Sequence, residues 1–504
     1  MFDGMSKITV VGRRDVLRAG VAVVAAGAAA VPTGGTAAAA GDHVLALTGV
    51  TVIDVGGRRP ERDATVLVRE DRIVAVGRRG DVRVPAGARV LDLPGKFVIP
   101  GLWDAHVHSI PAERISPPLY LANGITSVRE MSGSALLHEW RDRVDRGDLL
   151  GPRSVIASRI IDGAPTIGDP TAFVEVATEA QARDAVREAK RDGADFVKVY
   201  SRLPRHLHRA IAEEARLQRI PFAGHCPDAV PLGTAGAMGQ CSVEHLYSTW
   251  YDTSTREAEL RARIAGLTID RSDYVTWMHE IHRLEWDAAR SYSARKAAAV
   301  FAVLARNRTR IVPTLSVYRV LDRPGEVVLD DERLKYVPVA VVEGWRWALE
   351  NVIKAGWTPD EAAQRHALLD HRLAFVGELT RAGVPVVAGT DGGDVPFVIP
   401  GFGLHDELAT LVRAGLAPLD ALRAATIEPA RMLGLDDALG TVTPGKLADL
   451  VVLDADPLTD IRNTTRIHTV LTRGRVISPG QRTHMLADIA AAAAEPTASP
   501  TPTA

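Results

Sequence analysis

The sequence predicts an α/β protein: a (β/α)8 TIM barrel over residues 96–438 and a small β-sandwich built from both chain ends, residues 44–95 and 439–477. Through the middle of the chain, near-continuous apolar runs alternate with runs of helical periodicity, which is typical of parallel strands joined by helices. There are eight such apolar runs, the number that this barrel needs. With 504 residues, 46% hydrophobic and 24% charged, the chain can bury the cores of one barrel and one smaller domain.

The first segment, residues 1–40, has the composition of an export signal. The basic run Gly12-Arg13-Arg14-Asp15-Val16-Leu17-Arg18 precedes an apolar stretch over residues 19–31 and small residues from Ala37 to Ala40. The alternative is a membrane anchor, but the apolar stretch is shorter than the ~20 residues of a spanning helix. Consecutive arginines indicate the twin-arginine route. We therefore predict a signal peptide and an exported protein, periplasmic or extracellular, whose mature form has no stable membrane span.

Both ends of the remaining chain read as short strands separated by turn residues. Gly56-Gly57 and Pro85-Ala86-Gly87 supply turns between the first strands. The strands expected for the sandwich are 50–54, 64–68, 72–77, 450–454 and 467–471.

The middle of the chain supplies the strands of the barrel. They are expected at 97–108, 125–131, 153–161, 195–201, 221–226, 241–246, 310–317 and 384–391, with helices such as 178–191, 204–218 and 366–382 between them. An open doubly wound sheet is the alternative, but no glycine-rich phosphate loop follows the first strand.

Two connections, residues 247–309 and 318–383, are longer than a barrel requires, and each contains three tryptophans. Long loops after strands commonly cover an active-site mouth. Helices packed outside the barrel are the alternative, and the sequence leaves both open. The segment 487–504, rich in Ala, Pro, Thr and Ser, is predicted to be a disordered tail.

Charge and cysteine content exclude some classes of protein. The formal net charge is −2 and no block of like charge stands out, so no nucleic-acid partner is expected. An exported chain of this length with two cysteines, Cys226 and Cys241, is not built on disulfides.

Metal-ligating residue types end five of the predicted strands. His106 and His108 are two residues apart on one strand, so their side chains share a face. One such histidine, or an aspartate after Gly-Thr, is commonly a surface residue or a cap. Six residues at the same end of five strands predict a metal site, because reacting groups of a barrel lie at the carboxyl ends of its strands. The set is His106, His108, Lys198, His225, His245 and Asp391.

The motifs around these residues resemble the amidohydrolase superfamily, in its imidazolonepropionase/prolidase-like branch. The resemblance covers about residues 44–477. The motifs are Pro100-Gly101-Leu102-Trp103-Asp104-Ala105-His106-Val107-His108, Val197-Lys198-Val199, Gly224-His225, Val243-Glu244-His245, Gly389-Thr390-Asp391 and the run from Gly440 to Val451.

The resemblance implies two divalent metal ions, zinc by ligand type, with manganese or iron as alternatives. Lys198 would be carbamylated and bridge the two ions. His106, His108 and Asp391 would hold the more buried ion, and His225 and His245 the more exposed one. Asp391 would also be the catalytic residue that accepts a proton from the attacking water and passes it to the leaving amine.

Two positions depart from the pattern of the peptidase relatives, which carry a tyrosine just after the histidine of the fifth strand. Here Cys226 and Pro227 occupy these positions. Tyr200, on the same face as Lys198, is a candidate for the missing carbonyl contact, with packing as its alternative. Arg202 is a candidate for a substrate carboxylate, with solvent exposure as its alternative.

A second histidine pair lies outside this set. His279-Glu280-Ile281-His282 lacks the i, i+4 spacing of H-E-x-x-H, and a surface patch is predicted there.

The predicted function is metal-dependent hydrolysis of a small-molecule amide, a dipeptide of the Xaa-Pro kind or an N-acyl amino acid. The alternatives are a cyclic-amide hydrolase like imidazolonepropionase, a lactonase or organophosphate hydrolase, and a scaffold protein on the same fold. A homo-oligomer is a family expectation.

Overall fold

The structure is a computed structural model that describes residues 44–57, 59–166, 172–247, 249–268 and 274–495. The predicted signal peptide, residues 1–40, lies outside the described residues. No helix in the described part of the chain is long and apolar enough to cross a membrane.

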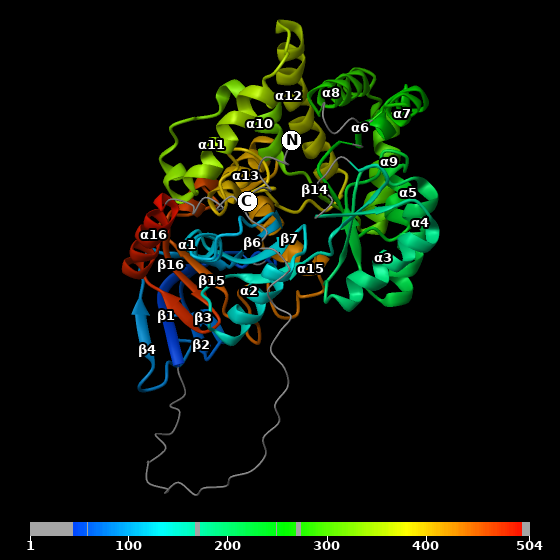
Figure 1. The fold of residues 1–504 in the computed structure, drawn as a ribbon. Helices are drawn as coiled ribbons and strands as arrows, with labels where there is room; N and C mark the ends of the chain where they lie inside the picture. Colours follow the sequence, from blue (N-terminus) through cyan, green and yellow to red (C-terminus); the bar gives the residue numbers. More distant parts are fainter. Residues whose placement is uncertain (1–43, 58, 167–171, 248, 269–273, 496–504) are drawn as a thin grey trace, which may run out of the picture.

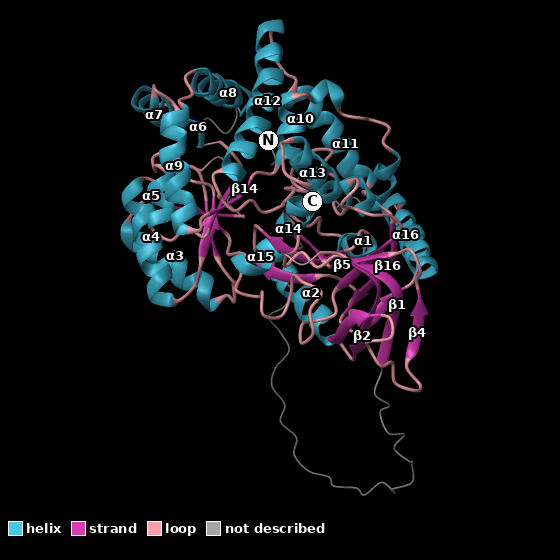
Figure 2. Ribbon diagram, turned by 180° about the vertical axis from the view of Figure 1, so that it is seen from behind, coloured by secondary structure: helices cyan, strands magenta, loops and turns pink. Residues whose placement is uncertain are grey.

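Strands from both ends of the chain pair in one eight-stranded sheet, which lies at one end of the molecule (Figure 2). The ends are joined where β5 and β15 pair antiparallel, with Val98 opposite Val452. Leu47, Val66 and Leu450 belong to the apolar core on this sheet. The strands hydrogen-bond as a single sheet, so the two facing layers of a sandwich stay a prediction. In sheet order they are β17 (Arg475–Ile477), β16 (Ile467–Thr472), β15 (Leu450–Leu453), β5 (Phe97–Pro100), β1 (Val44–Val52), β2 (Glu61–Arg69) and β3 (Arg72–Arg78), with β4 (Arg89–Asp92) beside β1.

The middle of the chain contributes two sheets of parallel strands, in agreement with the predicted α/β class. One sheet has the order β6 (Leu102–Val107), β7 (Ile125–Glu130), β8 (Arg153–Ile156). The other has the order β10 (Phe173–Val176), β9 (Ile160–Gly163), β11 (Val197–Val199), β12 (Phe222–Gly224), β13 (Ser242–Glu244), β14 (Arg310–Val312). The last four of these are only three residues long and almost entirely buried, as strands covered on both faces are.

The segment 384–391, predicted as the eighth strand, contacts both sheets through single bridges and not a continuous ladder. Parallel bridges join Ile311 to Val386 and Val107 to Gly392. A further parallel bridge joins the two sheets, between Ala157 and Phe196.

Gly389 lets this segment approach the first parallel strand closely. A Cβ at this position would lie 2.7 Å from the Cβ of His106 and 2.7 Å from Cγ1 of Val312. Only glycine fits there, and the neighbouring Asp391 is thereby brought beside His106.

Helices surround the parallel strands (Figure 1). The predicted helices 178–191, 204–218 and 366–382 are present as α3, α4 and α12. Helix α12 begins before the predicted residue 366, because Thr358 and Glu361 form a capping box and Pro359 occupies the first turn. The helices of the first half are α1 (Ser116–Ala122), α2 (Ala135–Arg146), α3 (Glu179–Arg191), α4 (Arg205–Gln218), α5 (Leu232–Ala237), α6 (Thr249–Thr253), α7 (Glu257–Ala265) and α8 (Tyr274–Arg290). Those of the second half are α9 (Ala294–Asn307), α10 (Leu315–Asp322), α11 (Val339–Ala348), α12 (Pro359–Arg381), α13 (Phe402–Arg413), α14 (Pro418–Ala424), α15 (Ile427–Met432) and α16 (Pro479–Ala494).

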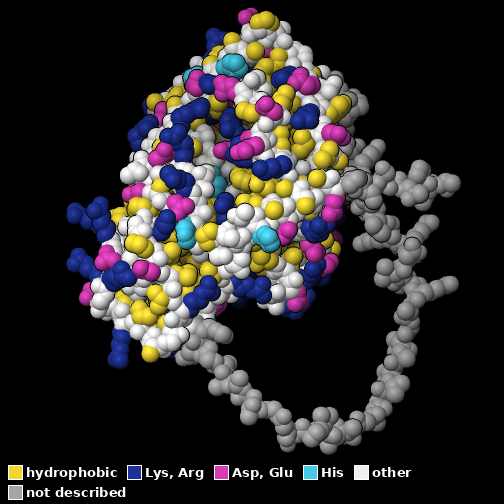
Figure 3. All heavy atoms as spheres, turned by 90° about the vertical axis from the view of Figure 1, so that its left-hand side faces the viewer, with side chains coloured by type: hydrophobic (Ala, Val, Ile, Leu, Met, Phe, Trp, Pro, Cys, Tyr) yellow, Lys and Arg dark blue, Asp and Glu magenta, His cyan; other side chains and the backbone are white. Residues whose placement is uncertain are grey.

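The two long connections are helical and gather at the end of the molecule opposite the eight-stranded sheet, where α8, α10 and α12 lie (Figures 1 and 2). Contacts of α8 and of α10 with α12 join the two connections to each other. Between α10 and α12 lie the short turns η2 (Pro324–Glu326), η3 (Glu332–Tyr336) and η4 (Leu349–Ile353), and η5 (Ile461–Thr465) lies near the C-terminal strands. On the face shown in Figure 3, acidic and basic side chains are intermixed.

The prediction of a disordered tail over 487–504 is wrong for residues 487–494, which form the second half of α16. Ser478 and Gln481 form a capping box at its start, and the run of alanines has high helix propensity. Ile489 and Ala493 are buried against Ile115 and Leu119. Residues 496–504 lie outside the described part of the chain.

Candidate metal centre and its cavity

The six predicted ligands come from the same ends of neighbouring parallel segments. His106 lies in β6 and His108 one residue past it, Lys198 is the middle residue of β11, and His225, His245 and Asp391 directly follow β12, β13 and the segment that ends at Thr390. The rings of His106 and His245 are 4.8 Å apart between centroids, as are those of His225 and His245. The sequence therefore identified residues that the fold does bring together.

Three of the histidines have a polar partner at the ring nitrogen Nδ1, which leaves Nε2 as the nitrogen for a metal. Such partners fix the orientation of a ligating imidazole. The pairs are His106 Nδ1 with Glu244 Oε2 at 2.9 Å, His225 Nδ1 with Ser201 Oγ at 2.7 Å, and His245 Nδ1 with Thr314 Oγ1 at 2.6 Å.

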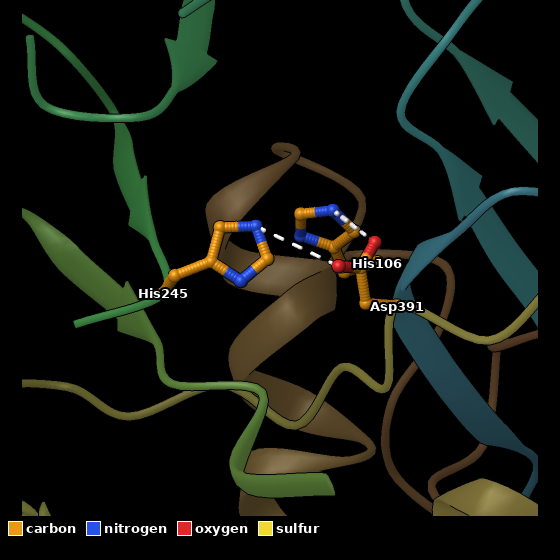
Figure 4. A group of neighbouring side chains, drawn as sticks. All are labelled: His106, His245 and Asp391. Carbon is orange, nitrogen blue, oxygen red and sulfur yellow. Dashed lines mark ion pairs between the residues drawn. The ribbon is translucent and has the colours of Figure 1, made fainter. Parts of the chain in front are cut away.

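Asp391 lies close to the rings of His106 and His245, and dashed lines mark its ion pairs with both (Figure 4). Its Oδ1 is 3.1 Å from Nε2 of His106 and 3.3 Å from Nε2 of His108, and its Oδ2 is 3.8 Å from Nε2 of His245. His106 Nε2 and Asp391 Oδ1 are buried without a hydrogen-bond partner. Buried polar atoms are rarely left in this state, and a cation between them would satisfy both. The donor set therefore fits a divalent metal ion.

A second group of possible ligands shares Asp391. Ligand atoms of His106, His245 and Asp391 lie within 4.8 Å of one another, and so do those of His108, Asp391 and Asp394. Asp394 was not predicted, although it stands three residues after Asp391 in Asp391-Gly392-Gly393-Asp394.

Burial and neighbouring charges keep three of the candidate ligands, His225, His245 and Asp391, in the protonation states that bind metal. Burial lowers the pKa of His245 to about 3 and that of His225 well below its ordinary value, so both rings are neutral near pH 7. Burial alone would raise the pKa of Asp391, but His106 and His108 hold it well below the ordinary value. Neutral imidazoles and an ionised carboxylate are the forms that ligate.

Lys198 is buried in this group, with 1% of its surface exposed. No described residue forms an ion pair or a hydrogen bond with its Nζ, which is unusual because buried lysines are normally paired. Burial lowers the pKa of its ammonium group to about 8. A neutral amine is therefore accessible close to neutral pH.

Strained backbone at two strand ends aims ligands into the centre. His245 has φ of 64° and Asp391 has φ of 61°, in the left-handed region that non-glycine residues rarely adopt. Such strain persists where the surroundings enforce it and is commonly functional. At Gly224 (φ 133°) a Cβ would lie 2.1 Å from the carbonyl oxygen of Val199, so glycine is required just before His225.

Glu244 supports the centre and was not predicted as a site residue, although it precedes His245 in the motif. Besides His106 it accepts a hydrogen bond from Arg129 at 2.7 Å, and both partners of that ion pair are buried. Burial would raise the pKa of Glu244, but Arg129 and His106 hold it far below the ordinary value. An ionised Glu244 fixes His106 with the proton on Nδ1.

Replacing Glu244 by glutamine is expected to weaken metal binding about 10- to 100-fold, because His106 loses the carboxylate that orients it. The free energy of unfolding of the metal-free protein should fall by about 3 kcal/mol, because the buried Arg129 loses its ion-pair partner. Metal titration and denaturant unfolding measure the two effects. The matched control is Glu188→Gln, an exposed position on α3. Unchanged metal affinity in Glu244→Gln would contradict this role.

A cavity of about 140 Å³ opens from the centre and is walled by the two long connections. His225, His245 and Asp391 line it on one side, and residues of α8, α10 and α12 line it elsewhere. The connections therefore do cover the site, which the sequence left open.

Two tyrosines lie beside the histidines in this cavity. The predicted Tyr200 lies with its ring centroid 3.9 Å from that of His225, and Tyr247, which was not predicted, lies 5.2 Å from His245. Arg202 does not line the cavity, and its guanidinium donates to the carbonyl oxygens of Ile264 and Leu267 at 3.4 and 3.3 Å. The structure thus gives no support to a substrate contact by Arg202.

The prediction of a surface patch at His279–His282 is wrong. His279 and His282 are 9% and 4% exposed, and His282 lines the cavity. The missed signal is helical periodicity: Met278, Ile281, His282 and Glu285 have the spacing i, i+3, i+4, i+7 and together face the cavity.

Metal-ligating side chains gathered at the carboxyl ends of parallel strands in an α/β fold are typical of a metal-dependent enzyme. The family model described as "Amidohydrolase family" matches residues 97–477, and the chain belongs to this family, as its motifs predicted.

Relatives and solved structures agree with this assignment. The chain is 24% identical to the dihydroorotase of Pelotomaculum thermopropionicum over 446 residues, 86% of this chain and 95% of that protein. It is 36% identical to adenine deaminase 2 of Agrobacterium fabrum over 137 residues, 27% of this chain, and spans only 21% of that relative's length. A solved structure of a bottromycin amidohydrolase is similar in fold, with a TM-score of 0.68 and 24% identity over 91% of this chain and 92% of that one. A putative prolidase from Bifidobacterium longum has a TM-score of 0.61 and 23% identity over 89% and 99%.

Proposed function

We propose that this protein hydrolyses the amide bond of a dipeptide or an N-acyl amino acid in a metal-dependent reaction. The observation that carries the proposal is that His225, His245 and Asp391 line a small-molecule-sized cavity with His106 beside them, and that the buried Lys198 has no ion-pair partner among the described residues. The similarity to a putative prolidase and a bottromycin amidohydrolase supports an amide as the bond cleaved.

We infer that the parallel segments close into the predicted (β/α)8 barrel. The bridges between Ala157 and Phe196, Ile311 and Val386, and Val107 and Gly392 support closure, because they link the two parallel sheets to each other and to residues 384–392. Closure would place every proposed ligand on one rim.

The proposed ligand assignment follows the family pattern. His106, His108 and Asp391 would hold one ion. His225 and His245 would hold the other ion, and carbamylated Lys198 would contribute to both. The ions, zinc or else manganese or iron, would supply Lewis-acid activation of a water molecule and of the substrate carbonyl when bound. Carbamylation needs the neutral amine, whose nitrogen bonds to the carbon of carbon dioxide and loses one proton.

The side chains of the protein would handle the proton and the substrate. Asp391 would accept the proton of the attacking water on a carboxylate oxygen and deliver it to the amide nitrogen as the C–N bond breaks. Tyr200, beside His225, would hold the carbonyl oxygen. The walls of the cavity would limit the access of bulk water, and a lower local dielectric constant would strengthen each of these interactions.

The test is the metal content of the mature chain expressed with bicarbonate and with zinc or manganese, followed by assays on dipeptides and N-acyl amino acids. Two metal ions per chain and hydrolysis of one of these substrates are expected. One ion per chain would contradict the bridged centre, and no metal after reconstitution would favour a scaffold role.

A cyclic amide is the second candidate substrate, favoured by the match to a dihydroorotase over 86% of this chain. Ring opening of a cyclic amide and cleavage of a dipeptide use the same attack on a carbonyl, so the site permits both. Hydrolysis of a cyclic amide in preference to any linear one would establish this alternative.

We also propose that the enzyme acts outside the cytoplasm, on the strength of the twin-arginine segment within residues 1–40. Fractionation of cells that produce the full chain tests this. Retention of the uncleaved protein in the cytoplasm would contradict it.

A further inference from the structure

One guanidinium in the cavity lacks the partner that its burial calls for. Arg365 of α12 lines the cavity with the metal ligands and is 3% exposed. Among the described residues, no carboxylate forms an ion pair with it, none is a hydrogen-bond partner of its Nε, and its one hydrogen bond runs from Nη1 to the carbonyl oxygen of Leu321 at 3.4 Å. Leaving a buried charged donor unsatisfied is costly, so a ligand acceptor is the natural complement.

The neighbouring acids do not supply that acceptor. Arg372, two turns later on the same face of α12, donates to Glu285 and to Asp322 at 2.9 Å each and stacks on Tyr318 at 3.7 Å. Arg365 and Arg372 carry two positive charges, and Glu285 and Asp322 carry two negative charges. Arg365 therefore offsets the charge of these acids at longer range, without an ion pair. The N–H donors of Arg365 remain available to a molecule in the cavity.

The guanidinium of Arg365 lies over an aromatic ring. Its Cζ is 3.8 Å from the centroid of the Trp357 ring, which is a cation–π contact. A contact of this kind occupies none of the N–H donors, so the edge of the guanidinium keeps its parallel N–H groups. That edge matches the two oxygens of a carboxylate.

A second unsatisfied group lies nearby. His282 of α8 also lines the cavity, is 4% exposed and has an Nε2 without a hydrogen-bond partner. Arg365 is among the charges that act on this imidazole. Met278, Ile281 and Ile353 contribute apolar surface to the wall of the cavity.

We propose that Arg365, with His282 beside it, binds the carboxylate of the substrate, while the amide lies at the metal ligands. The substrate class is then an N-acyl amino acid or dipeptide with a free carboxylate and an apolar side chain next to it. Arg365 takes the role that the sequence suggested for Arg202. The inference deepens the proposed function and rests on it for the placement of the amide, but not for the binding of the carboxylate.

The experiment measures binding separately from hydrolysis. N-acetyl-L-leucine and its carboxamide, N-acetyl-L-leucinamide, are titrated into the full protein by calorimetry, and each is assayed for hydrolysis. The first variant is Arg365→Met, which keeps the apolar part of the side chain. The second is Arg365→Lys, which keeps the charge but loses the two parallel N–H donors of the guanidinium. The control is Arg381→Met, at an exposed position on the same helix. Circular dichroism checks that each variant is folded.

We expect Arg365→Met to weaken binding of the acid about 100-fold and Arg365→Lys about 10-fold, while binding of the amide changes little. In the hydrolysis assay the loss should fall on KM for the acid and leave kcat nearly intact. Equal binding of acid and amide to the unmodified protein, or acid binding unaffected by Arg365→Met, would overturn the inference. If the acid binds through Arg365 but no amide is hydrolysed, the proposed function fails and the carboxylate site stands.

Discussion

Replacing Lys198 by alanine is expected to lower kcat by roughly 10³-fold or more and to reduce the metal content from two ions per chain to one or none. Lys198 is buried among the proposed ligands, and no described residue pairs with its Nζ, so its carbamate is the group that would bridge the ions. Short carboxylic acids such as formate or acetate should restore part of the activity, because they can supply the missing pair of oxygens. Metal analysis and initial rates measure both effects.

The pH dependence of carbamylation has a definite sign. Burial depresses the pKa of Lys198 to about 8, and only the neutral amine reacts with carbon dioxide. Reactivation of bicarbonate-depleted enzyme should therefore be slow below that pKa and become faster as the pH rises through it.

The matched control for Lys198 is Lys190→Ala, an exposed lysine on α3 that should behave as the unmodified protein does. Full activity in Lys198→Ala would exclude the bridged centre. Activity that survives with one ion per chain would shift the interpretation toward a mononuclear cyclic-amide hydrolase.

Replacing Asp391 by asparagine is expected to lower kcat about 10³-fold with little change in the binding of a substrate carboxylate. The substitution preserves size but removes the carboxylate that lies 3.1 Å from His106 and 3.3 Å from His108. An asparagine can neither accept the proton of the attacking water nor neutralise a cation. Steady-state kinetics and metal content provide the measurements.

Asp394→Asn is the comparison for Asp391→Asn, since Asp394 shares one candidate ligand group with His108 and Asp391 but lies outside the other. A loss of about 10-fold is expected for it, as for a residue that supports the ligands. If Asp394→Asn is inactive and Asp391→Asn is not, the proton-transferring carboxylate is Asp394.

The local pattern of apolar runs that end in polar residues predicted the parallel strands and the candidate ligands on them. The proximity of four residues could be predicted because side chains at the carboxyl ends of adjacent parallel strands lie close together whatever the rest of the fold is. These residues are His106, Lys198, His225 and His245. The same reasoning placed Asp391 correctly, although its segment forms single bridges in place of a strand.

Patterns of composition were less reliable. The alanines at 487–494 suggested disorder, but a capping box at Ser478 and burial of Ile489 and Ala493 make them helical. His279 and His282 were assigned to the surface because the metal motif was absent, whereas the face of α8 that carries His282 lines the cavity.

The sequence by itself predicted the family, the parallel α/β class and the candidate ligand set, because short motifs, periodicity and strand-end position are local properties. Only the tertiary structure revealed that Glu244 pairs with His106 and Arg129. It also revealed that Arg365 lines the cavity without an ion pair to any described residue, while Arg202 does not line it. These facts depend on how residues far apart in the chain, such as α8 and α12 of the two long connections, pack against each other. Hydrogen-bond partnership and burial of a charge are properties of that packing, and no local pattern encodes them.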